Sequence, residues 1–152
     1  MIKQSKISVR HLVEFILRRG SIDNRKKSNH TALEGARIHR KLQKDAGENY
    51  EKEVFLKTTV QLDEYHLIVE GRADGIFKRD GIYYIDEIKT SEPRFEDLEP
   101  EQVELFFHQA RVYAYIYSQE HDLQEINLQL TYFQTAEEVI TRKVEHQTRE
   151  QL

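Results

Sequence analysis

The sequence predicts an α/β (α+β) fold, with a mixed central β-sheet of about five strands flanked by α-helices. Three observations lead to this prediction. Helix-like and strand-like runs follow one another in the order α-α-β-β-β-α-β-β, the dipeptide Asp80-Gly81 separates two strand-like runs, and Pro100 opens a long helical run. A chain of 152 residues suits one hydrophobic core, so we expect a single domain over residues 1–152.

Two helices are expected before the first strand. The first covers residues 8–19 and carries an apolar stripe that includes Val9 and Val13. Residues 20–30 are polar and basic, which predicts a loop. The second helix covers residues 31–44, and its apolar positions are Leu33, Ala36 and Leu42.

The remaining elements are mostly strands. Ile, Val, Tyr and Phe are frequent in the first three strand-like runs, and apolar and polar residues alternate in the last two. An acidic loop and a helix that begins at Pro100 separate the two groups. In chain order, the expected ranges are strands 53–62, 65–79 and 82–90, loop 91–99, helix 100–119, and strands 126–135 and 139–146.

Composition excludes several classes of protein. The chain has no cysteine, which excludes disulfides, cysteine-bound zinc and an iron–sulfur cluster. Because no apolar run approaches about 18 residues, no membrane segment is expected. The first residues also lack an apolar signal segment, so we expect a cytoplasmic protein.

Charge is unevenly distributed along the chain. The net charge is −4, yet residues 1–44 hold twelve Lys or Arg and only three Asp or Glu. A basic front half can follow a phosphate backbone, and an acidic remainder can hold metal ions. The basic residues can equally form a solvated helix face, and charge alone does not decide between these interpretations.

The Asp80-Gly81 dipeptide is typical of a two-residue type I′ hairpin turn. Such a turn pairs Arg79 with Ile82 and, further along, Ile76 with Ile85. The same register places Asp74 opposite Glu87 and Arg72 opposite Lys89. Asp74 and Glu87 would then form a non-hydrogen-bonded pair, with their Cβ atoms about 4.5–5.5 Å apart.

Two carboxylates that face each other in a largely apolar hairpin repel strongly. A divalent cation relieves this repulsion, and hard oxygen ligands at this separation suit Mg²⁺ or Mn²⁺. Lys89 lies on the same face as Glu87 because side chains alternate along a strand, whereas Asp86 points to the opposite face. The alternative is a cross-strand salt-bridge ladder of Asp74, Glu87, Arg72 and Lys89, and the hairpin alone leaves it open.

Four short motifs follow one another along the chain: Gly35-Ala-Arg-Ile-His39, Gly71-Arg-Ala-Asp74, Glu87-Ile-Lys89 and Gln109-Ala-Arg-Val-Tyr113. This series resembles the PD-(D/E)XK nuclease superfamily, in its RecB-like branch, and within that branch the nuclease domain fused to DinG/XPD-type helicases. The resemblance implies a restriction-endonuclease-like core. It also implies a metal-dependent deoxyribonuclease, an exonuclease that works in DNA repair or recombination alongside a helicase domain or partner.

The resemblance assigns roles by position. Asp74, Glu87 and His39 would bind Mg²⁺ or Mn²⁺, joined by the backbone carbonyl of Ile88. Lys89 would orient the attacking water and offset charge on the phosphate. Gln109 and Tyr113, which share one helix face, would support the site and contact nucleic acid. The expected substrate is DNA that is single-stranded or has free ends, and the side chains expected to contact it are Arg37, Arg40, Lys41 and Arg72.

Ordinary alternatives stand beside these roles. His39 can be a plain helix residue, Tyr113 a core residue, and Glu53 a solvated strand residue. A second function hypothesis is a catalytically silent DNA-binding or docking module with the same fold. The sequence leaves open the choice between exonuclease and endonuclease, the choice between DNA and RNA, the number of metal ions and the oligomeric state.

Overall fold

A computed structural model provides the fold, and it describes residues 3–16 and 29–152. Within these residues the protein is a mixed α+β structure in which helices flank a six-stranded sheet. In chain order its elements are β1 (Lys3–Ser8), α1 (Val9–Ile16), α2 (Asn29–Asp45), β2 (Glu51–Leu62), β3 (Tyr65–Arg79), β4 (Ile82–Ser91), η1 (Phe95–Asp97), α3 (Pro100–His121), β5 (Glu125–Gln134), β6 (Val139–Thr148) and η2 (Arg149–Gln151).

The sheet contains one strand more than the sequence predicts. The strand order is β1-β3-β4-β5-β6, and β2 also pairs with β3. β1 is parallel to β3 and β4 is parallel to β5, whereas the other pairs are antiparallel. The additional strand is β1, a mostly polar segment whose strand form comes from its pairing with β3.

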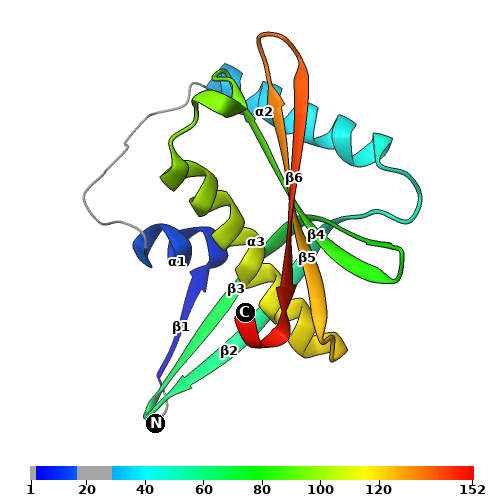
Figure 1. Ribbon diagram of the computed structural model, residues 1–152. Coiled ribbons are helices and arrows are strands. Elements are labelled where there is room, and N and C mark those ends of the chain that lie inside the picture. Colours follow the sequence, from blue (N-terminus) through cyan, green and yellow to red (C-terminus); the bar gives the residue numbers. More distant parts are fainter. Residues whose placement is uncertain (1–2, 17–28) are drawn as a thin grey trace.

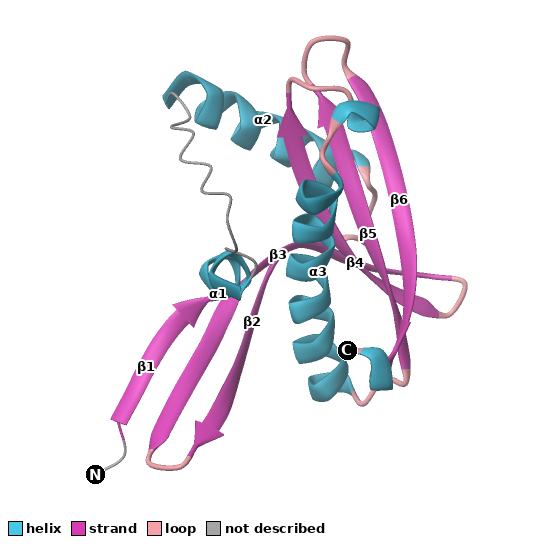
Figure 2. Ribbon diagram, turned by 60° about the vertical axis from the view of Figure 1, so that its left-hand side comes forward, coloured by secondary structure: helices cyan, strands magenta, loops and turns pink. Residues whose placement is uncertain are grey.

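Strand β3 is the centre of this arrangement because its two edges are used differently. β2 follows one edge along residues 65–76. The other edge is shared, since β1 pairs with residues 65–70 and β4 with residues 75–79. Residues 71–74 therefore lie between the ends of two neighbouring strands. The ribbon of β1, β2 and the first half of β3 extends away from β4, β5 and β6 (Figures 1 and 2).

Helix α3 packs along the sheet and covers the main core (Figure 2). The core contains apolar side chains from α1, α3 and the strands, among them Val9, Ile76, Ile85, Ala114 and Leu128. α1 packs against α3 and β3. Among the described residues, no helix is long and apolar enough to cross a membrane.

The first helix begins one residue later than predicted. Ser8 ends β1, and its hydroxyl accepts a hydrogen bond from the backbone N–H of His11 at 3.1 Å, as a helix-capping residue does. The predicted end of this helix and most of the predicted loop 20–30 lie outside the described residues.

The predicted apolar stripe of the second helix is wrong in part. Leu33 is 72% exposed and Ala36 is also exposed, whereas Ile38 and Gln43 are buried. The side of α2 that faces the sheet contains both polar and apolar residues. The spacing of apolar residues alone therefore does not identify the buried side of this helix.

Candidate active site at the split between strands

The hairpin turn that the sequence predicts is confirmed. Asp80 and Gly81 have φ angles of 52° and 82°, and two consecutive positive values are the signature of a type I′ turn. The register is also as predicted near the turn, where Arg79 pairs with Ile82 and Ile76 with Ile85.

The predicted pairing fails further from the turn. Asp74 is not paired with Glu87, nor Arg72 with Lys89, because the pairing of β3 with β4 ends at Gly75↔Asp86. In a continued ladder the N–H of Ile88 would bond to the carbonyl of Ala73. It donates instead to Oδ2 of Asp74 at 2.7 Å. A carboxylate thus takes the place of a backbone carbonyl, and the two strands part at this point.

The carboxylates of Asp74 and Glu87 nevertheless influence each other. The side chain of Asp74 is 18% exposed and that of Glu87 is 7% exposed. Burial raises the pKa of Asp74 to about 8, and the charge of Glu87 contributes to this rise. The Ile88 hydrogen bond and the charge of Lys89 act in the opposite direction. The structure therefore keeps a partly buried acid, Asp74, near a buried one, Glu87, at an energetic cost.

Lys89 is the cation that faces these acids. Its Nζ lies 3.0 Å from Oε1 of Glu87, and it also lies 5.4 Å from the ring centroid of Phe106 on α3. Both contacts hold the ammonium group on the α3 side of the sheet, next to Glu87. This is the face that strand alternation predicts for Lys89.

His39 reaches the same place from helix α2. Its Nδ1 lies 3.8 Å from Oδ1 of Asp74, and its side chain is 28% exposed. One turn earlier, a Cβ built on Gly35 would lie 3.2 Å from Oγ1 of Thr90. Thr90 points away from the face of Lys89, so α2 approaches the sheet from the side opposite α3. The small residue at position 35 permits this close approach.

Gln43 is a site residue that the sequence analysis missed. It lies four residues after His39 and hence on the same face of α2. Its Nε2 donates to the backbone carbonyl of Asp74 at 2.7 Å and to Oε1 of Glu53 at 3.0 Å. Its spacing of four residues from His39 could have identified it, because residues on one side of a helix face the same neighbouring element.

Tyr113 borders the site from α3. Burial raises the pKa of its hydroxyl, and the charges of Glu87 and Asp74 raise it further, whereas the charge of Arg10 and a hydrogen bond to the backbone of Arg72 lower it. Gln109, one turn earlier on the same face, is 4% exposed. The sequence predicted both positions, but it gave no indication that Arg10 of α1 lies close enough to influence Tyr113.

Gly71 explains how Tyr113 approaches β3. A Cβ at this position would lie 2.6 Å from the Tyr113 hydroxyl oxygen, and 3.1 Å from its Cε1. Only a residue without a side chain leaves room for the ring at the gap in the β3 edge. The side chain of the next residue, Arg72, is exposed.

The basic residues of α2 are not brought to the carboxylates. Arg37, Arg40 and Lys41 are exposed; at 100° per residue, Arg37 and Lys41 lie roughly opposite His39 and Gln43, and Arg40 lies to one side of them. The helix therefore turns one face towards Asp74 and a basic face towards solvent.

Asp86 lies in a different environment from its neighbour in β4, Glu87. It is 4% exposed and accepts hydrogen bonds from three side chains, Tyr50 Oη at 2.7 Å, Thr131 Oγ1 at 2.6 Å and Gln129 Nε2 at 3.2 Å. A Cβ at Gly75 would overlap the ring of Tyr50, so this position also has to be glycine. The network lies on the face opposite Glu87 and satisfies the Asp86 carboxylate within the protein.

The donor set around Asp74 suits a hard divalent cation. It combines two carboxylates and an imidazole, which are ligand types that Mg²⁺ and Mn²⁺ accept. Burial and the charge of Glu87 raise the pKa of Asp74, and a bound cation would favour its ionised form. In the part of the chain that the structure describes, no three His, Asp or Glu side chains already stand in a metal-holding arrangement.

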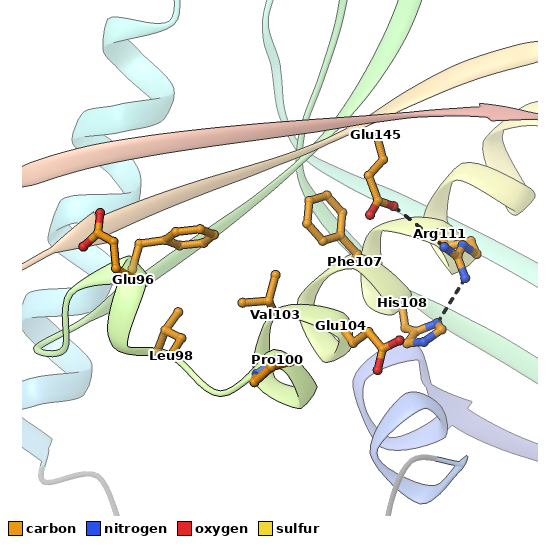
Figure 3. A pocket seen from close by; sticks show the side chains of 10 residues that line it. Glu96, Leu98, Pro100, Val103, Glu104, Phe107, His108, Arg111 and Glu145 are labelled. Atoms are coloured by element: carbon orange, nitrogen blue, oxygen red, sulfur yellow. Dashed lines mark hydrogen bonds and ion pairs between the residues drawn. The ribbon is translucent and has the colours of Figure 1, made fainter.

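A pocket of about 460 Å³ lies elsewhere on α3, towards η1 and β6 (Figure 3). Apolar side chains such as Val103 and Phe107 line it together with Arg111, which contacts His108 at 3.4 Å and Glu145 at 3.8 Å. Its lining includes neither acid of the candidate site, so the pocket is a separate feature.

Comparison with known proteins adds information about the fold. No family model matches the chain, and no curated protein matches it. Among solved structures, the crystal structure of SSO0001 is similar with a TM-score of 0.59 and 18% sequence identity. The similarity covers 97% of this chain and 71% of that one. At this identity the likeness concerns the fold alone.

Proposed function

We propose that this protein is a metal-dependent nuclease domain that hydrolyses phosphodiester bonds in DNA. The observation that carries the proposal is the group formed by partly buried Asp74 and buried Glu87, with Lys89 3.0 Å from Glu87 and His39 3.8 Å from Asp74. A cross-strand salt-bridge ladder does not account for this group, because the pairing of β3 with β4 ends at Gly75↔Asp86, before either Asp74 and Glu87 or Arg72 and Lys89 could pair. The resemblance of the four motifs to the RecB-like PD-(D/E)XK nucleases supports the same function.

Asp74, Glu87 and His39 would hold Mg²⁺ or Mn²⁺, with the carbonyl of Ile88 as a further ligand. When bound, the ion would lower the pKa of an attached water and draw charge from the scissile phosphate. The hydrogen bond from the Ile88 N–H fixes the Asp74 carboxylate at 2.7 Å and so orients its other oxygen. This preorganisation reduces the cost of assembling the ligands.

Lys89 would stabilise the negative charge that develops on the phosphate. Its contacts with Glu87 and Phe106 hold the ammonium group in place before substrate binds. Hydrolysis would add the water oxygen to phosphorus and break the bond to the 3′-oxygen, which leaves a 5′-phosphate and a 3′-hydroxyl. Gln109 and Tyr113 would border the reacting strand from α3.

Arg72 is exposed, lies two residues before Asp74 and would contact a phosphate beside the site. Arg37 and Lys41 lie on the side of α2 away from Asp74 and Arg40 lies between the two sides, so these three residues would bind a more distant part of the DNA strand. The proposed substrate is DNA that is single-stranded or has free ends. The proposed setting is DNA repair or recombination alongside a helicase domain or partner.

Digestion of single-stranded and plasmid DNA with Mn²⁺ tests the proposal. The natural chain is expected to cleave, Glu87→Gln is expected to lose activity, and the control Glu101→Gln, an exposed acid of α3, is expected to retain it. If the natural chain and Glu87→Gln are equally inactive while both bind DNA, the proposal is overturned in favour of a catalytically silent DNA-binding module.

A further inference from the structure

The carbonyl of Asp74 is held by a side chain of another element. Gln43 is 4% exposed, and its amide nitrogen lies 2.7 Å from the Asp74 carbonyl oxygen and 3.0 Å from Oε1 of Glu53. The two hydrogens of one amide group can serve these two acceptors. Gln43 thus links α2, β2 and β3 at the residue on which the candidate site depends.

The backbone shows why this link is needed. The pairing of β2 with β3 runs from Lys52↔Gly75 to Val54↔Ala73 and passes over Glu53 and Asp74. Glu53 has a φ of 52°, a left-handed conformation that is uncommon for glutamate. A local departure of this kind costs free energy and persists only where surrounding contacts maintain it. The Gln43 amide supplies such contacts to both residues.

Asp74 is therefore fixed at both ends. Gln43 holds its backbone carbonyl, and the Ile88 N–H holds its carboxylate. On the β4 side the ladder also stops short of Asp74, at Gly75↔Asp86. With regular pairing interrupted towards both neighbours, these two hydrogen bonds replace the ladder in setting the position of Asp74.

We propose that Gln43, supported by Glu53, is a positioning residue that sets the orientation of the Asp74 carboxylate towards Glu87. This inference rests on the proposed function for its catalytic meaning, although the positioning itself concerns the metal-free protein. Gln43 acts through Asp74 and needs no contact with metal or substrate. A purely structural link between α2 and the sheet would contribute to stability without controlling the Asp74 carboxylate.

The test compares two buried glutamines. Gln43→Met removes the amide but keeps the length of the side chain. The matched control is Gln134→Met, because Gln134 is 7% exposed and its Nε2 also donates to a backbone carbonyl, that of Glu92, at 3.3 Å. Gln43→Met loses two hydrogen bonds of a buried amide and Gln134→Met loses one, so both should lower the melting temperature, Gln43→Met by more. If Gln43→Met does not fold, Gln43→Asn replaces it in the test. Its side chain is one methylene shorter, so the amide no longer reaches the same acceptors.

The first readout is hydrogen exchange of the Ile88 amide in metal-free protein, measured relative to the amide of Leu128 in the core of β5. Because Ile88 donates to the Asp74 carboxylate, its protection reports whether that carboxylate stays in place. Gln43→Met is expected to accelerate this exchange at least about 10-fold, and Gln134→Met is expected to leave it unchanged. Glu53→Gln, which keeps an acceptor for Gln43, is expected to resemble the natural chain.

The second readout is Mn²⁺ affinity by calorimetry. Gln43→Met is expected to weaken it about 10-fold or more, as loss of residues that orient ligands commonly does, whereas Gln134→Met should not. Unchanged Ile88 protection in Gln43→Met, or an equal change in Gln134→Met, overturns the positioning role. Absence of Mn²⁺ binding by the natural chain would overturn the proposed function instead, and the exchange measurement would still decide the role of Gln43.

Discussion

The carboxylate of Asp74 accepts the backbone hydrogen bond that the N–H of Ile88 would otherwise donate across the sheet, at 2.7 Å. A side chain thereby becomes part of the connection between β3 and β4, and the strands separate beyond Gly75↔Asp86. The separation opens a place where Glu87, Lys89 and His39 can reach Asp74 from different elements.

Metal-free stability is expected to fall as pH rises from about 4 to 8. Burial raises the pKa of Asp74 from 3.8 to about 8, so the folded state binds a proton that the unfolded state releases. The stabilisation from this proton is fully present below pH 3.8 and is lost as pH approaches 8. Asp74→Asn should remove the effect and raise the free energy of unfolding at pH 8 by about 1–3 kcal/mol.

Urea unfolding at pH 5 and pH 8 measures this difference. Asp45→Asn, an exposed change at the end of α2, provides the control and should keep the pH slope of the natural chain. A slope in Asp74→Asn equal to that of the natural chain would contradict the assignment of the effect to Asp74.

Mn²⁺ is expected to raise the melting temperature. A ligand that binds only the folded state stabilises it by about 2.7 kcal/mol at a concentration 100 times its dissociation constant, and for a chain of this size that corresponds to roughly 5–10 °C. Asp74→Asn should abolish the rise, whereas Glu101→Gln should preserve it. Thermal unfolding with and without millimolar MnCl₂ provides the measurement, and an equal rise in Asp74→Asn would count against Asp74 as a ligand.

Gly71→Ala is expected to destabilise the protein by about 1–3 kcal/mol through crowding. The added Cβ would lie 2.6 Å from the Tyr113 hydroxyl oxygen. Tyr113→Phe removes that oxygen, so the double variant should lose less stability than the two single changes together. A double-mutant cycle from urea unfolding gives this coupling, and additive losses would show that Tyr113 does not approach position 71 as described.

Asp86 and Glu87 are adjacent but should respond in opposite ways. Asp86→Asn replaces one of the two carboxylate oxygens that accept from Tyr50, Gln129 and Thr131 by an NH2 group. It is expected to cost about 2–4 kcal/mol of stability because this NH2 group cannot accept from the donor that faces it. Glu87→Gln should cost less and should instead suppress the Mn²⁺ response. Unfolding curves with and without Mn²⁺ separate the two, and a larger stability loss in Glu87→Gln would reverse the assignment.

Most of the fold could be predicted because its elements have strong local signals. The Asp80-Gly81 turn determined the hairpin register near the turn, and alternation correctly placed Lys89 with Glu87 and Asp86 on the other face. Strand β1 could not be predicted, because the segment KQSKIS lacks an apolar pattern and forms a strand through its pairing with β3.

The site was predicted less completely because part of it depends on tertiary contacts. A register count assumes that backbone pairing continues, and it therefore missed the substitution of the Asp74 carboxylate for a ladder carbonyl. Gln43 was missed because its role depends on how α2 lies over β3, which no local pattern states. The exposed position of Leu33 has the same origin, since the buried face of α2 is determined by its polar contacts at positions 39 and 43.

Lys89→Met is expected to separate catalysis from metal binding. Lys89 contacts Glu87 at 3.0 Å and lowers the pKa of Asp74, so its charge stabilises both acids when no metal is present. Its removal leaves the acids less compensated, and a cation then relieves more repulsion when it binds. Mn²⁺ affinity should consequently stay equal or increase, while the rate of DNA cleavage should fall about 10²–10³-fold through loss of charge stabilisation at the phosphate.

Lys89→Arg keeps the charge and should retain part of the rate. Calorimetric Mn²⁺ titration and single-turnover cleavage of the same preparations make the comparison. If Lys89→Met loses metal affinity in proportion to rate, Lys89 acts by organising the ligands rather than at the phosphate.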